Sequence, residues 1–170
     1  KQKTAYEIRL SLVGSEMCIR DSATALPDLE LLGLSDLTTP APLHEPDEIG
    51  HTFEHNAAIK ALSYAHQTNL PCVADDSGLE IDALQGRPGV ISSHYFNEGR
   101  TDGPALNMPR LQRDQLNNAR VLTELQGVDF EHRTARFVCV MAVAAPHLLA
   151  TFRSTFGGRI GSVSYTHLRA

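Results

Sequence analysis

Apolar residues recur with a helical period in two parts of this chain. The first helix is expected to begin after Thr52, whose side chain can cap the free N–H groups, and to stop at Asn69. The residues expected on its buried face are Phe53, Ala57, Ala58, Ala61, Leu62 and Ala65. A second helix is expected to end at Gly127. Its expected apolar face consists of Leu116, Ala119, Leu122 and Leu125.

Strands are expected where the period shortens to two or where the chain is continuously apolar. Residues 71–74 are typical of a short buried strand, and residues 79–83 alternate as a half-buried strand does. Residues 135–145 are apolar enough for the interior of a sheet, and 148–156 are expected to return antiparallel to them. Helices and strands intermix, so we expect an α/β fold.

The segments between these elements have the composition of loops. Residues 38–50 hold three prolines and end in a glycine, and GRPG at 86–89 is typical of a turn. Residues 97–112 are polar, with glycine and proline, and are expected to form a long loop. No internal repeat or low-complexity tract interrupts this order, so the pattern indicates an ordinary globular domain.

Composition agrees with a globular protein and excludes several classes. The chain has 170 residues, of which 42% are hydrophobic and 21% charged. We expect neither a membrane span nor a secretory signal. Three cysteines without a paired pattern favour a reducing compartment, so a cytoplasmic location is expected. A formal net charge of −5 argues against a general nucleic-acid binder.

The two ends of the chain are related at the level of DNA. GSEMCIRD, at 14–21, and VSYTHLRA, at 163–170, can be encoded by reverse-complementary sequences, codon for codon. No packing requirement relates a peptide to its antisense translation, so we interpret residues 1–22 and 163–170 as adapter-like, non-native segments. Residues 23–162 are then a partial domain, expected to be cut at both ends. Its formal charge is −7, and Lys60 is its one lysine.

The first chemically suggestive stretch is VADDSGLEID, Val73 to Asp82. A carboxylate at the end of a strand, followed by Ser77 and Gly78, sits where α/β sheets bind ligands and can hold Mg²⁺ or act as a general base. The alternative is an acidic turn, since Asp-Asp-Ser-Gly is good turn chemistry. Adjacent strand side chains point to opposite faces, so only one of Asp75 and Asp76 is expected to meet a ligand.

Further oxygen ligands for a metal come from the loop before the first helix. Glu45, Asp47 and Glu48 lie there, although a solvated acidic loop explains them equally well. Four histidines, His44, His51, His55 and His66, also occur in this region, but their spacing matches no zinc site.

Four stretches, taken in order, resemble the inosine triphosphate pyrophosphatase family. They are TFEHNAAIKA, LPCVADDSGLEIDALQGRPGVISSHY, NNARVLTEL and RTARFVCVMAVA, within residues 30–160. Members hydrolyse ITP, dITP and XTP to the monophosphate and pyrophosphate with Mg²⁺. The resemblance implies a twisted mixed β-sheet flanked by helices, in a two-lobed fold that is incomplete here. It also implies a substrate cleft between the lobes and a homodimer.

Carried over by position, the resemblance implies roles for three residues. Asp76 is expected to be the catalytic base and a metal contact, Ser77 to touch the substrate, and Glu48 to be the second Mg²⁺ ligand. Ile49 replaces the threonine that commonly follows this glutamate.

The chain also departs from the family. Its Thr-x-Asn-x-x-Lys phosphate loop, its Gly-Phe-Gly-Tyr-Asp-Pro segment and its terminal Ser-His-Arg do not occur. An alternative is therefore an inactive fragment that binds metal or nucleotide weakly or serves in dimerisation. A third hypothesis makes Asp75 a covalent nucleophile, although the expected Asp-x-Asp spacing is missing.

Overall fold

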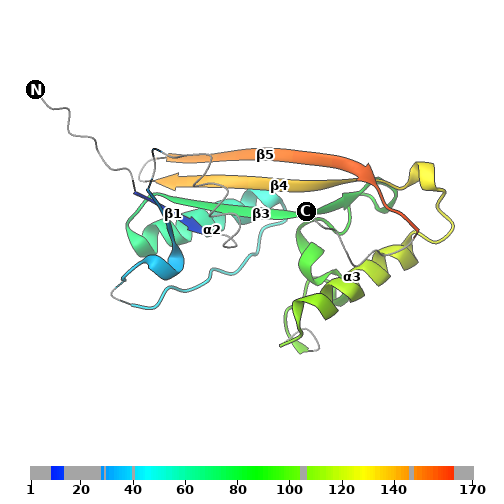
Figure 1. The fold of residues 1–170 in the computed structure, drawn as a ribbon, viewed down its shortest axis with the longest axis horizontal. Coiled ribbons are helices and arrows are strands. Elements are labelled where there is room, and N and C mark those ends of the chain that lie inside the picture. Colours follow the sequence, from blue (N-terminus) through cyan, green and yellow to red (C-terminus); the bar gives the residue numbers. More distant parts are fainter. Residues whose placement is uncertain are drawn as a thin grey trace, which may run out of the picture. The chain divides into compact units, whose positions relative to one another are not determined.

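A five-stranded sheet with the strand order β2-β1-β3-β4-β5 forms the framework of the computed structural model (Figure 1). The structure describes residues 9–13, 28, 30–39, 41–103, 107–145 and 148–162. The strands are β1 (Arg9–Val13), β2 (Glu30–Gly33), β3 (Cys72–Ile81), β4 (Thr134–Ala145) and β5 (Leu148–Arg159). The α-helices are α2 (Phe53–Thr68) and α3 (Arg110–Glu124). The 3₁₀ helices are η1 (Leu34–Asp36), η2 (Asp82–Leu84), η3 (Gly89–Asn97) and η5 (Phe130–His132).

The sheet is mixed, which confirms the α/β prediction. β1 runs parallel to both β2 and β3, whereas the arrows of β4 and β5 point in opposite directions in Figure 1. The chain divides into two compact units. One holds the described residues up to Asp76 together with Val140–Arg153, and the other holds Ser77–Cys139 and the described residues from Ser154.

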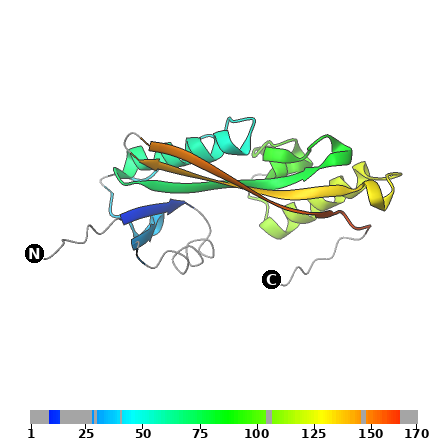
Figure 2. The same ribbon diagram turned by 90° about the horizontal axis from the view of Figure 1, so that it is seen from above.

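In the first unit, α2 begins and ends as its sequence predicts. Thr52 Oγ1 accepts a hydrogen bond from the His55 N–H at 3.2 Å, and Asn69 takes the left-handed conformation that ends the helix. Figure 2 shows α2 alongside the first half of β3. The residues that α2 buries are Phe53, Asn56, Ala57, Ala61 and Tyr64.

The predicted inner face of α2 was partly wrong. Leu62 is 48% exposed, and Ala58 and Ala65 are half-buried. Successive helical residues are about 100° apart around the axis, so Leu62 lies well away from the line through Ala61. Measured around the axis from Phe53, Leu62 lies about 180° away, whereas the polar Asn56 and the aromatic Tyr64 lie within about 60° and are buried instead.

Strand β1 lies within residues 1–22, the segment interpreted above as adapter-like and non-native. It pairs with β3 from Ser11 against Cys72 to Val13 against Ala74, and Ser11 N–H donates to the Pro71 carbonyl at 2.9 Å. The adapter-like origin of residues 1–22 remains a prediction, but Arg9–Val13 nevertheless supply a strand. Residues 163–170, interpreted in the same way, lie outside the described residues.

Asp-Asp-Ser-Gly forms no turn, contrary to one of the two alternatives. β3 continues unbroken from Cys72 to Ile81, so the two expected short strands are one. Ser77 is exposed and Gly78 buried, an alternation that suits a strand. β3 lies between β1 and β4 in the sheet, and pairing of this kind overrides local turn propensity.

In the second unit, the buried face of α3 matches the predicted one only in part, since Leu125 was predicted and is buried and Leu122 is half-buried. Asn117, Val121 and Leu125 are buried, whereas Leu116 and Ala119 are exposed. The core of this unit consists of Ile81, Leu84, Tyr95, Val121, Leu125 and Ala135. The helix starts at Arg110, so the polar loop before it is shorter than expected.

The predicted turn, loop and apolar strand are confirmed, whereas α3 ends at Glu124, three residues before the predicted stop at Gly127. GRPG forms the turn between η2 and η3, and residues 41–50 are loop. β4 matches the predicted 135–145 strand almost to the residue.

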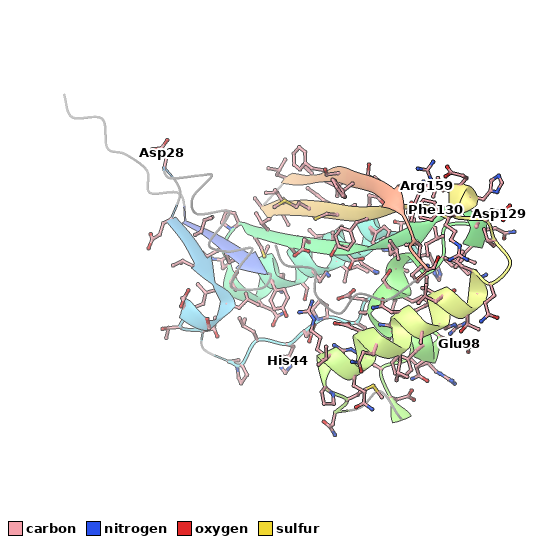
Figure 3. All side chains as sticks on the ribbon, turned by 45° about the vertical axis from the view of Figure 1, so that its right-hand side comes forward. Asp28, His44, Glu98, Asp129, Phe130 and Arg159 are labelled. Carbon is pink, nitrogen blue, oxygen red and sulfur yellow. The ribbon has the colours of Figure 1, made fainter. Side chains whose placement is uncertain are left out.

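In the second unit, the Arg159 guanidinium lies 5.9 Å from the centre of the Phe130 ring (Figure 3). None of the described helices is long and apolar enough to cross a membrane.

Candidate active site

A polar stripe runs along α2 in the first unit. It consists of Asn56, Lys60, Ser63 and Gln67, spaced four, three and four residues apart, which places them in a row on one helix face. All four side chains make hydrogen bonds or ion pairs to groups outside the helix or to one another. The stripe therefore presents side-chain amides, a hydroxyl and one ammonium group to the loop that precedes α2.

Lys60 is the centre of this stripe and joins two of the predicted site residues. Its Nζ lies 3.3 Å from Glu48 Oε1 and 3.3 Å from Asp76 Oδ1. The Lys60 and Asp76 side chains are only 13% and 10% exposed, so this ammonium group is largely removed from water. The structure thus brings Glu48 and Asp76 to one place, and Lys60 links them.

Glu48 reaches this place because the loop turns sharply and then docks on α2. Ile49 N–H donates to the Asp47 carbonyl at 3.1 Å, which closes a tight turn centred on Glu48. Gly50 N–H then donates to Asn56 Oδ1 at 2.8 Å. A Cβ on Gly50 would overlap that oxygen and lie 2.9 Å from His55 Cβ, so only glycine permits this approach.

Asp76 has one hydrogen-bonded carboxylate oxygen and one that is buried without a partner. Oδ1 accepts from Lys60 at 3.3 Å, while no described protein group donates to Oδ2. Burial raises the pKa of Asp76 above its ordinary value; the Lys60 charge and the nearby Asn56 side chain oppose this shift, and the Glu48 charge adds to it. A raised pKa and a free oxygen make this carboxylate a competent proton acceptor and metal ligand.

Asp75 does not share the contact with Lys60 that Asp76 makes. It is half-buried, and burial raises the pKa of its carboxyl as well, against the opposing charge of Lys60. Pairing between β1 and β3 ends at Ala74. Both aspartates therefore follow directly on the carboxyl end of β1, the side of a parallel sheet where ligands usually bind.

Ser77 is not brought together with the other predicted site residues. It is exposed, and the alternation of β3 directs its side chain to the face opposite that of Asp76. Its role in substrate binding remains a prediction. The histidines likewise form no metal site, since no three His, Cys, Asp or Glu side chains of the described residues gather closely enough to hold a metal.

Magnesium fits the Glu48–Lys60–Asp76 group better than a metal that needs a complete protein cage. Mg²⁺ commonly uses one or two carboxylates and takes its other ligands from water and substrate phosphates. Asp76 Oδ2 is a buried carboxylate oxygen without a partner, which a cation would satisfy. Two carboxylates, Glu48 and Asp76, also share the one Lys60 ammonium group, so this group of three side chains keeps an excess of negative charge.

Sequence reasoning missed Lys60 and Asn56 as parts of the site. Lys60 was noted only as a single lysine, although its spacing of four residues from Asn56 was a usable signal. A lysine and an asparagine in one row on a helix that is otherwise rich in alanine point to a polar contact. The partners themselves come from the loop and from β3, and only the folded chain brings them near.

Known proteins resemble this chain over most of its length. A curated protein from Nitratidesulfovibrio vulgaris, named dITP/XTP pyrophosphatase, is 48% identical over 118 residues, which are 69% of this chain and 53% of that protein. A protein of the same name from Geobacter sulfurreducens is 40% identical over 147 residues, which are 85% of this chain and 65% of that protein. The chain thus spans about half to two thirds of the length of these relatives.

The fold has a solved counterpart as well. The structure of the Staphylococcus aureus Ham1 protein matches with a TM-score of 0.75 and 31% sequence identity, over 92% of this chain and 74% of that one. This match confirms the twisted mixed sheet that the resemblance implied. The model of the Ham1 family covers residues 17–166. The chain therefore belongs to the Ham1 family.

Proposed function

We propose that this chain is a Mg²⁺-dependent nucleoside triphosphate pyrophosphatase. It converts aberrant purine nucleotides (dITP, XTP and ITP) to the monophosphate and pyrophosphate and so removes them from the nucleotide pool. The observation that carries the proposal is the Lys60 bridge between Glu48 and Asp76 in a chain of the Ham1 family. Two relatives carry the name dITP/XTP pyrophosphatase, which supports the choice of substrates. A homodimer and a cytoplasmic location belong to the same proposal.

The reaction breaks the anhydride between the α- and β-phosphates, and water supplies the new oxygen. Asp76 accepts the proton of that water, since its raised pKa makes it a stronger base than an ordinary aspartate. Glu48 and Asp76 are the carboxylates that would hold Mg²⁺. When bound, the metal neutralises phosphate charge.

Lys60 has two tasks in this scheme. It keeps Glu48 and Asp76 near each other when no substrate is bound, because its ammonium group offsets their mutual repulsion. Its ammonium hydrogens are also available to phosphate oxygens, for which lysine is a common partner. A triphosphate carries several negative charges, so a site with a fixed cation suits it better than a purely acidic pocket.

The direct test uses the purified chain with dITP and Mg²⁺. The products are separated by ion-exchange chromatography, and dIMP and pyrophosphate are expected in equal amounts. EDTA is expected to stop the reaction. ATP is the control substrate and is expected to turn over much more slowly, because an enzyme that cleans the pool must spare the ordinary nucleotides.

The alternative is an inactive fragment that at most binds metal or nucleotide weakly. Absence of dIMP, while the dITP/XTP pyrophosphatase of Nitratidesulfovibrio vulgaris forms it in a parallel assay, would favour this alternative. Isothermal titration with Mg²⁺ and with dITP would then separate weak binding from none.

A further inference from the structure

The loop before α2 is also held at a second point, by a side chain whose hydrogen bonds go to groups other than Glu48 and Asp76. Gln67, near the end of α2, binds the backbone of His44. His44 lies in the loop before the helix (Figure 3). His44 N–H donates to Gln67 Oε1 at 2.7 Å, and Gln67 Nε2 donates to the His44 carbonyl at 2.9 Å. One side chain thus satisfies both backbone groups of one loop residue, as a neighbouring strand would.

Only a carboxamide of this length can make this pair of contacts. It carries a donor and an acceptor side by side, whereas a carboxylate only accepts and an ammonium only donates. The second N–H of the Gln67 amide donates to Ser63 Oγ at 3.1 Å, one turn back on α2. That bond fixes which way the amide faces, so the acceptor oxygen is directed at the His44 N–H.

The two amide contacts enclose Glu48. Gln67 holds His44, four residues before Glu48, and Asn56 holds Gly50, two residues after it. Asn56 and Gln67 are about 16 Å apart along the helix, at about 1.5 Å per residue. The six steps of chain from His44 to Gly50 reach about 20 Å when extended, so the loop has little slack between its two anchors.

We propose that Gln67 is a positioning residue that acts through the loop to hold Glu48 against Lys60. The expected effect of Gln67 on turnover rests on the proposed function, whereas its expected effect on the position of the loop does not. Without Gln67 the loop keeps one anchor, at Gly50, and the part that carries Glu48 gains freedom to swing away from Lys60. Gln67 itself touches neither carboxylate, so its effect must pass through the loop.

Hydrogen exchange of the backbone amides tests the clamp directly. The variants are Gln67→Leu, which removes both contacts, Gln67→Glu, which keeps only the acceptor, and His66→Leu, a matched change at the neighbouring exposed position. Exchange over residues 44–50 is expected to rise about threefold to tenfold in Gln67→Leu, the factor for one or two net hydrogen bonds, and less in Gln67→Glu. Equal exchange in Gln67→Leu and His66→Leu would overturn the proposal.

A double-mutant cycle in urea unfolding tests whether the clamp acts on Glu48. Residues that do not touch usually have additive effects on stability, whereas coupled ones do not. Gln67→Leu is expected to raise the unfolding constant about threefold in the wild-type background and by less in Glu48→Gln, where the Lys60 contact is already weakened. Strict additivity would mean that Gln67 anchors the loop without presenting Glu48, which contradicts the proposal.

The kinetic test measures the Mg²⁺ concentration that half-saturates dITP hydrolysis. It is expected to rise about threefold to tenfold in Gln67→Leu while kcat at saturating Mg²⁺ recovers, a split that general loss of structure does not produce. The same change in the Glu48→Gln background is expected to have no further effect, and an equal rise there would overturn the proposal. If the wild-type chain shows no turnover, the proposed function fails, whereas exchange and unfolding still decide the role of Gln67.

Discussion

Two largely buried carboxylates, one in each unit, differ in how many of their oxygens have hydrogen-bond partners. Glu124 of the second unit accepts from Tyr95 Oη at 2.7 Å and from Arg120 Nε at 2.8 Å, and Arg87 Nη1 lies 2.9 Å away. Asp76 of the first unit accepts one hydrogen bond, from Lys60, and leaves its other oxygen without a donor.

The pKa values of the two carboxyls move apart accordingly. Burial pushes both upward, but at Glu124 the hydrogen bonds from Tyr95 and Arg120 and the arginine charges outweigh burial and lower the pKa. At Asp76 burial prevails and raises it. A carboxylate with all its partners serves stability, whereas one that lacks a partner keeps its capacity for a ligand or a proton.

The largest expected effect is on catalysis, from Asp76→Asn. This change keeps the shape of the side chain and removes the base, so the rate of pyrophosphate release should fall about 10²–10⁴-fold. Stability at neutral pH should be retained, because Lys60 keeps Glu48 as a partner. A rate close to wild type would remove Asp76 from its proposed role.

Glu124→Gln is the opposite case and should affect stability rather than turnover. Loss of the charge weakens contacts to two arginines and should lower the free energy of unfolding by about 1–3 kcal/mol. The lower end is expected, since the Arg87 side chain is 55% exposed and its charge is screened. Urea unfolding measures the stability of this variant, and dITP hydrolysis measures its turnover. A large loss of turnover with unchanged stability would reverse the contrast with Asp76.

Gly50→Ala tests how closely the acidic loop must approach α2. The new Cβ would meet Asn56 Oδ1 and His55 Cβ, so the loop must shift, at a cost of about 1–3 kcal/mol in unfolding free energy. Turnover should fall as well, because Glu48 moves with the loop. Gly157→Ala on β5 is the matched control, since its Cβ meets nothing within 4 Å. Thermal unfolding of the two variants side by side would decide the matter, and equal melting temperatures would contradict the close approach.

The smallest expected effects are slopes of stability against pH, with opposite signs. The pKa of Asp76 is raised above 3.8, so the unfolded chain ionises first as pH rises and the folded state loses stability up to the raised value. The free energy of unfolding of Asp76→Asn should therefore rise relative to that of wild type as pH increases from 3.8 to the raised pKa.

The pKa of Glu124 is lowered below 4.5, so its contribution is complete above 4.5 and disappears as pH falls through the lowered value. The advantage of wild type over Glu124→Gln should therefore shrink on acidification. Urea unfolding of wild type and both variants across the acid range measures both slopes. Slopes of the same sign would show that the two carboxylates are not in the contrasting environments described.

Local signals predicted the limits of α2 but not the course of β3. Thr52 and Asn69 act within one turn of the helix, so their effect is visible in the sequence. Asp75 to Gly78 favour a turn by local propensity, yet β3 runs through them as the neighbour of β1 and β4. Such pairing depends on residues far away in the chain, and a strand from residues 1–22 was not anticipated at all.

The acidic residues of the candidate site could be predicted from the sequence, but the contacts that join them could not. Asp76 was preferred over Asp75 by resemblance, and the structure places Asp76 against Lys60. The bridge itself joins residues from a loop, a helix and a strand, and no period within one element can reveal it. The Gln67 clamp was invisible for a further reason, since it binds backbone groups, which every residue except proline supplies in full.

The clamped loop also has a consequence in conformational entropy. Pro42 and Pro46 flank His44 at two residues on either side, and each ring fixes its backbone φ near about −65° before folding begins. A segment stiffened in this way loses less freedom when it docks, so two hydrogen bonds to a half-exposed glutamine suffice to hold it. His44 lies between the prolines and keeps the N–H that they lack, so a stiffened segment still offers the donor that Gln67 binds.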